Sequence, residues 1–166
     1  SPLQRLSAEL GRSTVIIVIG SGEPVYEKRM LAVAHECPNV LFLNGYSELL
    51  ADPVYAAGDL FLMPSSFEPC GISQMLAMRS GQPCVVHGVG GLRDTVVHGE
   101  TGFVFDGETS QAQADNFVTA TREALEWRSD DPAGWKTMCE RAMEQRFSWQ
   151  LCAKRTVREL YGFNDD

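Results

Sequence analysis

The chain has 166 residues, of which 44% are hydrophobic and 22% are charged, and it is long enough to bury a hydrophobic core. Its formal net charge of −8 disfavours a nucleic-acid partner, because a phosphate backbone would be repelled. No apolar run approaches the ~20 residues of a membrane span, and the first residues carry no signal-peptide pattern. These features predict a single globular domain over 1–166, with neither a nucleic-acid nor a membrane partner.

The five cysteines are odd in number and form no Cys-x-x-Cys pair. This pattern disfavours both a disulfide framework and a zinc site. We therefore expect free thiols, no metal site and a cytoplasmic protein.

The first two thirds of the chain alternate strand-like and helix-like segments. Residues 14–19 form a continuous β-branched run, which is typical of a parallel strand covered on both faces. This alternation predicts an α/β fold, a Rossmann-like doubly wound parallel sheet. Pro53 should end or bend the helix in which it lies. The remaining strands are predicted at 40–43, 59–64, 84–86 and 102–105, and the helices at 24–36, 47–57 and 71–80, with a helical turn after Gly90-Gly91.

From about residue 110 the sequence predicts a C-terminal helical tail. Ser110 and Gln113 fit a capping box, and Asp131-Pro132 fits a helix N-cap followed by proline. Ser148 could cap a last helix that ends near Tyr161.

Ligands of an open parallel sheet bind beyond the carboxyl ends of its strands, so the loops there form the candidate site. Gly20 and Gly22 follow the first strand, where glycine lets a ligand approach the backbone. The third glycine of a dinucleotide fingerprint would fall at Val25, which disfavours a dehydrogenase, and no cofactor is expected. A plain strand-to-helix turn is the alternative interpretation of these glycines.

Gly45 and Tyr46 follow the second predicted strand. An aromatic ring at this place could stack on a nucleotide base, because every base offers a π-face. The alternative is that Tyr46 covers the edge of the core.

The loop after the third strand, residues 64–74, carries most of the functional information. Gly71, Ile72 and Ser73 would expose free backbone N–H groups in the first turn of a helix, an arrangement suited to a diphosphate. Glu68 beside such an anion site suits a neutral polyol such as a sugar, because a carboxylate accepts hydrogen bonds from hydroxyls. The alternative is a structural Glu68 that caps the helix. No second carboxylate of comparable placement supports a glycoside hydrolase.

The run Phe67-Glu68-Pro69-Cys70-Gly71, followed by Ile72-Ser73-Gln74, resembles the hallmark of glycogen and starch synthases. Other segments fit the same family in the same order along the chain. They are Gly45-Tyr46, residues 57–65, 77–81, 90–96 and 101–105, and Phe147-Ser148-Trp149.

The resemblance implies the C-terminal, nucleotide-sugar-binding half of a bacterial glycogen or starch synthase, a glycosyltransferase with the GT-B fold. In that family Tyr46 would stack on the base beside Gly45, and the amides from Gly71 to Ser73 would bind the diphosphate. Glu68, the candidate catalytic residue, and Cys70 would border the donor sugar. The implied reaction is the retaining transfer of glucose from ADP-glucose or UDP-glucose to the non-reducing end of an α-1,4-glucan.

Two departures from the family pattern bear on this interpretation. Wider families of retaining GT-B transferases carry a second glutamate where this chain has Leu76, and glycogen and starch synthases share that departure. The Arg and Lys that hold the diphosphate should precede the first segment seen here, and Arg5 and Arg12 do not stand in that motif. The N-terminal domain that binds the α-glucan acceptor is also missing, so this chain alone is expected to be inactive. The alternatives are a nucleotide- or glucan-binding module without transfer, and a GT-B transferase for another sugar or acceptor.

Overall fold

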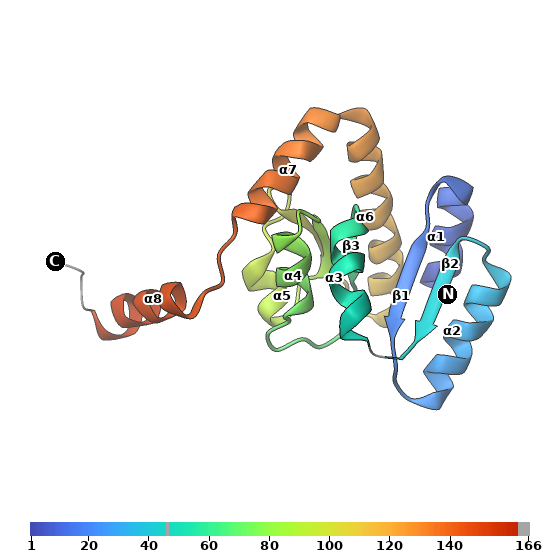
Figure 1. Ribbon diagram of the computed structural model, residues 1–166, viewed down its shortest axis with the longest axis horizontal. Helices are drawn as coiled ribbons and strands as arrows, with labels where there is room; N and C mark the ends of the chain where they lie inside the picture. The colour runs from blue at the N-terminus through green and yellow to red at the C-terminus, as the bar shows by residue number, and fades with distance from the viewer. Residues whose placement is uncertain (46, 163–166) are drawn as a thin grey trace.

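The computed structural model describes residues 1–45 and 47–162 (Figure 1). Parallel strands alternate with helices that pack on them, so the predicted α/β, Rossmann-like class is confirmed. The strands form two parallel groups, and within the described residues no pairing joins them. One group pairs β1 (Ile16–Gly20) with β2 (Val40–Asn44), and the other follows the order β3 (Phe61–Met63), β4 (Cys84–His87), β5 (Gly102–Phe105).

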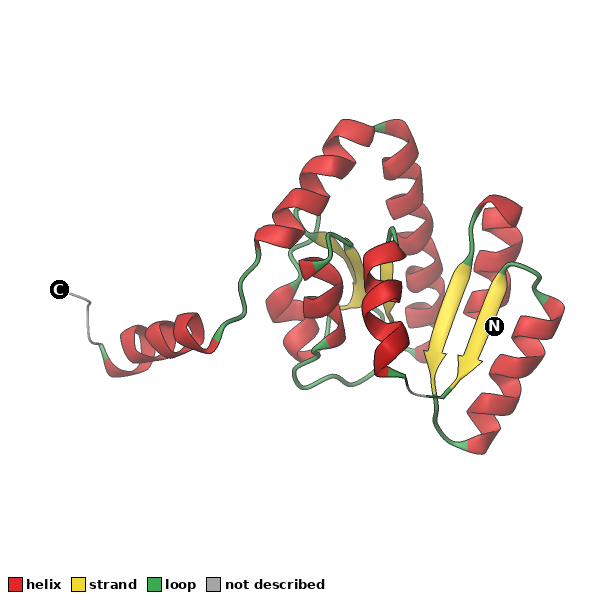
Figure 2. Cartoon of the chain, viewed as in Figure 1, coloured by secondary structure: helices red, strands yellow, loops and turns green. Residues whose placement is uncertain are grey.

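The helices largely match the predicted segments, and Figure 2 shows them around the strands. The exception is α1, whose first turn is closed by a capping box between Ser1 and Gln4. Leu3, Leu6 and Leu10 have the spacing of one helix face, which is the sequence signal for this helix, and Leu6 is fully buried. The helices are α1 (Pro2–Leu10), α2 (Pro24–Glu36), α3 (Glu48–Ala57), α4 (Ser73–Arg79), α5 (Gly90–Thr95), α6 (Ser110–Asp130), α7 (Pro132–Glu144) and α8 (Trp149–Tyr161), with a 3-10 turn at Gly11–Ser13.

Pro53 was predicted to end or bend its helix. It lies inside α3, which continues to Ala57, so it does not end the helix. Proline removes one hydrogen bond, to the carbonyl of Leu49, and that residue is so exposed that water can replace the missing donor. The cap of α6 is Thr109, whose hydroxyl accepts from the amide of Ala112, so the predicted cap at Ser110 was one residue late. The predicted caps Asp131 and Ser148 are both confirmed.

The sheet of β3, β4 and β5 is covered on both faces. All four residues of β4 are buried. Val85 points into a core cluster shared with α1, α2, α6 and α7, whereas Cys84 and Val86 point into a second cluster with residues of α4, α5 and α7. This two-sided burial explains why the strand sequence is apolar without alternation.

The pair of β1 and β2 is covered on one face only. Ile16 and Val40 belong to the first core cluster. On the other face Ile17, Leu41 and Leu43 are between 43% and 49% exposed. The prediction that the run at 14–19 forms a strand covered on both faces is therefore wrong for β1 in this chain, whereas β4 is covered in that way.

The helical tail has two parts. Helices α6 and α7 pack on the sheets and contribute buried residues such as Phe117, Ala124 and Trp135 to the core. Helix α8 stands apart from the body of the molecule, as Figure 1 shows, and Trp149 at its start is 90% exposed. No helix in the described part of the chain is long and apolar enough to cross a membrane.

Candidate functional site

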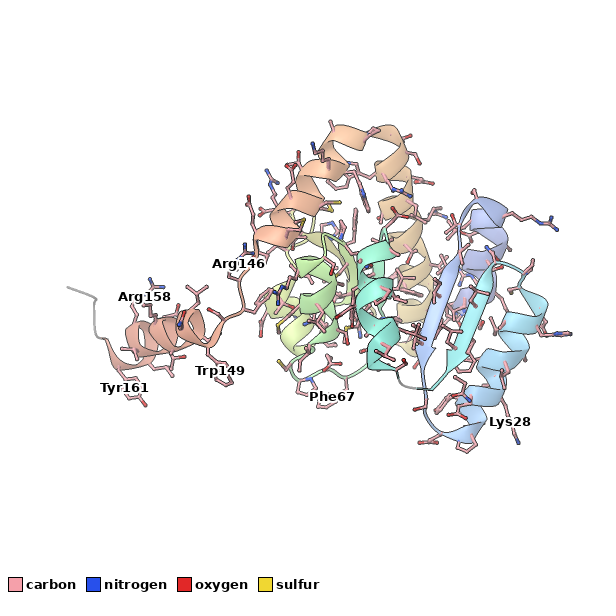
Figure 3. All side chains as sticks on the ribbon, in the orientation of Figure 1. Lys28, Phe67, Arg146, Trp149, Arg158 and Tyr161 are labelled. Atoms are coloured by element: carbon pink, nitrogen blue, oxygen red, sulfur yellow. The ribbon has the colours of Figure 1, made fainter. Side chains whose placement is uncertain are left out.

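The candidate residues lie on loops at one edge of the molecule. Strands β1 and β2 point their carboxyl ends to the lower side in Figure 2, and the loop that follows β3 runs along that side. Figure 3 shows Phe67 of this loop on the same side, projecting outward with 82% of its surface exposed. The structure thus brings the predicted loops to one edge, as expected of the carboxyl ends of parallel strands.

Gly20, Gly22 and Gly45 lie at or just beyond the carboxyl ends of β1 and β2. The amide of Gly45 donates to the carbonyl of Gly20 over 3.0 Å, which joins the loops after β1 and β2. Gly45 has a φ of 140°, a conformation that favours glycine. The residue that follows, Tyr46, lies outside the described residues, so its stacking role remains a prediction.

Glu27 of α2 closes the loop that contains Gly22. Its carboxylate accepts from the amide of Gly22 over 3.0 Å and from the side chain of Asn44 over 3.2 Å. These two hydrogen bonds, the one from Gly22 first, lower the pKa of Glu27 because they stabilise its charged form. A phosphate approaching Gly22 would therefore have to displace a carboxylate from this amide.

Glu68 lies half-buried in the loop between β3 and α4, and its backbone carbonyl accepts from the amide of Gly91 over 3.2 Å. Helix α4 has Ile72 at its N-cap position and no side-chain cap. Within the described residues Glu68 therefore makes no capping hydrogen bond to this helix. Within the described residues its carboxylate has no hydrogen bond or ion pair, so it is free to address a ligand.

The three residues predicted to bind a diphosphate lie where α4 begins. The helix begins at Ser73, two residues later than predicted, so Gly71 and Ile72 belong to the preceding turn. Gly71 is buried with a φ of 75°, and Ile72 is 68% exposed. Among the described residues, the amides of Gly71, Ile72 and Ser73 have no hydrogen-bond acceptor. They form a run of unsatisfied donors beside Glu68.

Two glycines of α5 allow this loop to pack tightly. A Cβ atom on Gly90 would lie 2.0 Å from the carbonyl oxygen of Glu68, and one on Gly91 would lie 2.1 Å from that of Cys70. No side chain can be added at such distances without moving the backbone. The glycine pair therefore fixes the position of the Glu68 loop against α5.

Two side chains that sequence reasoning left without a role hold the same loop. Gln74 is fully buried and donates to the carbonyls of Cys70 and Gly71 and to the hydroxyl of Thr95. Thr95 in turn donates to the carbonyl of Gly91 over 2.6 Å. The available signal was an amide side chain at position 74 on the otherwise apolar inner face of a helix, where Ala77 and Met78 follow.

The cysteines differ in environment. All five are free, and Cys70 of the candidate site is exposed. Cys84 is fully buried, and its burial raises the pKa of the thiol, because the charged thiolate loses its solvation. In the described part of the chain, no group of three or more His, Cys, Asp or Glu side chains could hold a metal ion.

Comparison with known proteins gives a family for most of the chain. The profile described as "Glycosyl transferases group 1" matches residues 3–126. The glycogen synthase of Streptococcus sanguinis (strain SK36) is 42% identical over 165 residues, and that of Deinococcus radiodurans is 43% identical over 153 residues. These matches cover 96% and 92% of this chain but only 34% and 33% of the relatives, so the chain spans about a third of their length.

Solved structures share the fold. The catalytic domain of Starch Synthase IV from Arabidopsis thaliana, bound to ADP and acarbose, has a TM-score of 0.76 and 31% identity. The match covers 89% of this chain and 32% of that one. Anabaena Alr3699/HepE in complex with UDP-glucose has a TM-score of 0.70 at 24% identity and covers 98% of this chain and 44% of its own, which shows a common fold alone.

Proposed function

Because the chain belongs to the glycosyl transferase group 1 family, we propose that it is the donor-binding half of a retaining glucosyltransferase. The complete protein would move glucose from ADP-glucose, or from UDP-glucose, to the non-reducing end of an α-1,4-glucan. The relatives named glycogen synthase support this proposal, as does the fold shared with a starch synthase bound to ADP.

One observation carries the proposal: within the described residues, a carboxylate without a partner and three backbone amides without acceptors lie in the same short segment between β3 and α4. The amides of Gly71, Ile72 and Ser73 offer hydrogen bonds to a diphosphate, and charge-assisted bonds of this kind are stronger than neutral ones. The carboxylate of Glu68 cannot bind the same diphosphate, because two negative charges repel each other. It can accept hydrogen bonds from sugar hydroxyls. A diphosphate joined to a sugar satisfies both groups at once.

The other predicted residues take places around this centre. Cys70 would border the donor sugar, and Tyr46 would stack on the base with Gly45 beside it. Gly20 and Gly22 would border the nucleotide through their backbone, with Gly22 released by Glu27 when the ligand enters. The chain would be one half of a GT-B fold, as a single Rossmann-like nucleotide-sugar-binding domain with a helical tail. The glucan acceptor would bind the other half.

Transfer would require both the donor-binding half and the acceptor-binding half, because water must be excluded while the glucosyl group moves. The 166-residue chain alone is therefore expected to transfer no glucose. This expectation separates a donor-binding half from a complete enzyme.

The experiment that tests the proposal uses the full-length protein and the 166-residue chain side by side. Each is given ADP-glucose or UDP-glucose with a labelled glucose, together with glycogen. We expect the full-length protein to incorporate label from one of the two donors, and the chain to incorporate none. If the full-length protein binds the nucleotide but incorporates no labelled glucose into glycogen, the protein is a binding module instead. Incorporation by the chain alone would contradict the assignment of half a site.

A further inference from the structure

Gln74 occupies an unusual place for an amide side chain. It is fully buried, and it lies on the inner face of α4 next to Ala77 and Met78. Its Oε1 atom has no hydrogen-bond donor within the described residues. A buried acceptor without a partner lowers stability. The reason for an amide side chain at this position must therefore lie with its Nε2 atom.

The other polar atom of the carboxamide, Nε2, has three hydrogen-bond acceptors around it. Nε2 lies 2.9 Å from the carbonyl oxygen of Gly71, 3.2 Å from that of Cys70 and 3.2 Å from the hydroxyl of Thr95. The Thr95 hydrogen is directed to the carbonyl of Gly91. All three atoms around Nε2 are therefore acceptors, and a rotated carboxamide would place Oε1 against them. The hydrogen bonds fix the orientation of the side chain.

These contacts determine where the neighbouring N–H groups point. In a planar trans peptide, the carbonyl of one residue and the N–H of the next point in opposite directions. The carbonyls of Cys70 and Gly71 are directed at Gln74, so the N–H groups of Gly71 and Ile72 point away from it. These are two of the three amides without an acceptor.

Gly71 and Gln74 also fit one another sterically. A Cβ atom on Gly71 would lie 2.3 Å from Oε1 of Gln74, so the side chain fills the space that glycine leaves. The left-handed φ of Gly71 would otherwise permit several orientations of the flanking peptides. The glycine allows the unusual turn, and the glutamine restricts it to one arrangement.

We propose that Gln74 is a positioning residue that holds the two peptide planes flanking Gly71 so that the N–H groups of Gly71 and Ile72 face the donor diphosphate. This inference rests on the proposed function and deepens it. Without the carboxamide, either peptide can rotate and present its carbonyl oxygen to the phosphate, which repels an anion. The residue touches neither donor nor acceptor and acts through the backbone.

The test compares Gln74→Met with Gln82→Met in the full-length protein. Gln82 is a matched control: it is 3% exposed, and its Nε2 donates to the carbonyls of Val54 and Tyr55 at the end of α3. It precedes β4, at the opposite end of the strand from the site. Methionine keeps the volume in both variants and removes the donors.

Each variant is titrated with ADP, UDP and the matching nucleosides by calorimetry. We expect Gln74→Met to lower the affinity for the nucleoside diphosphate that the wild type binds by about tenfold or more. The affinity for the matching nucleoside should not change. The donor KM should rise in parallel. Gln82→Met should lower the melting temperature without changing either affinity. A purely structural Gln74 would give the Gln82 result.

Thr95→Val provides a second variant should Gln74→Met fold poorly. It removes the hydroxyl that accepts a hydrogen bond from Gln74 and hardly changes the shape of the side chain. It should also lower the affinity for the diphosphate, by a few-fold. If the wild type transfers glucose and both variants bind the diphosphate normally, the positioning role is overturned and the proposed function stands. If the wild type binds no nucleoside diphosphate, both are overturned.

Discussion

The two strand groups both contain apolar segments but have different surroundings. Residues 16–19 of β1 and 84–86 of β4 are apolar, yet every residue of β4 is buried, whereas Ile17 of β1 is 47% exposed. β4 has α4 and α5 on one face and α6 on the other, but β1 is covered only on the face that contains Ile16. An apolar run predicts that both faces of a strand are covered. The elements that cover those faces, however, lie elsewhere in the sequence, and the run itself does not identify them.

The loops at the ends of these strands differ in the same way. Gly22 has open space where a Cβ atom would be added, whereas Gly91 would place that atom 2.1 Å from a backbone carbonyl. The loop of Glu68 is held by Gln74, Thr95 and two close glycines, while the loop of Gly22 is held mainly by the carboxylate of Glu27. Preorganised donors belong on the rigid loop, because they gain most from a fixed geometry.

The largest effect is expected at Glu68 on the rigid loop. Glu68→Gln in the full-length protein should lower kcat about hundredfold or more and change the donor KM little, as for loss of one preorganised electrostatic group. The melting temperature should stay near that of the wild type, because within the described residues the carboxylate has no partner. Steady-state kinetics and thermal unfolding of the same sample check both statements.

The contrary outcome is equally definite. Normal kcat with a lowered melting temperature would return Glu68 to a structural role. Phe67→Leu is a useful control on the same loop, since that side chain is 82% exposed and should affect neither measurement strongly.

Next in size is a pair of glycine substitutions that compares the two loops directly. Gly91→Ala should lower the free energy of unfolding by about 3 kcal/mol, because the new Cβ atom meets the carbonyl of Cys70. Gly22→Ala should change it by less than about 0.5 kcal/mol, because nothing lies within 4 Å. Urea unfolding of both variants of the 166-residue chain provides the measurement. Equal losses would show that both loops are equally tight.

Much of the fold could be predicted because its local signals are strong. The β-branched run at 14–19 and the caps at Asp131 and Ser148 are short-range patterns, and each appears in the structure. The split between the strand groups could not be predicted, since strand pairing depends on contacts far apart in sequence. Pro53 does not end α3, because the cost of one missing hydrogen bond depends on access to water.

The candidate site residues were named from the sequence, but the side chains that support them were not. Glu68 and the amides near Gly71 could be named because they follow a predicted strand, where ligands of a parallel sheet bind, and because the run around them resembles a known family. The part played by Gln74 could not be read from spacing, since its partners are backbone carbonyls and the hydroxyl of Thr95 on another helix. Only the fold brings Thr95 and Gly91 against this loop.

A third comparison concerns the cores beneath the loops. Val85→Ala should lower the free energy of unfolding of the chain by about 2 kcal/mol, since the side chain is fully buried between helices. Ile17→Ala removes more atoms, yet it should cost less than about 1 kcal/mol because the side chain is half exposed. Repeating both in the full-length protein sharpens the comparison: a larger cost for Ile17→Ala there would show that another segment covers β1. Equal costs in the chain itself would contradict the difference in burial.

The smallest effect is expected at Glu27, and it depends on pH. The folded chain lowers the pKa of Glu27 through the amide of Gly22 and the side chain of Asn44. Because the pKa is lowered in the folded state, the stabilisation is complete above the ordinary pKa of the unfolded chain and is lost as the pH falls through the lowered pKa of the folded chain. The gap in melting temperature between the wild type and Glu27→Ala should therefore be present at neutral pH and close on acidification. Glu123→Ala, at an exposed glutamate of α6, supplies the constant offset that comes from replacing a helical glutamate with alanine. A gap for Glu27→Ala that stays constant with pH would mean that the carboxylate does not hold the Gly22 loop, and the two loops would then differ less in their support than their contacts indicate.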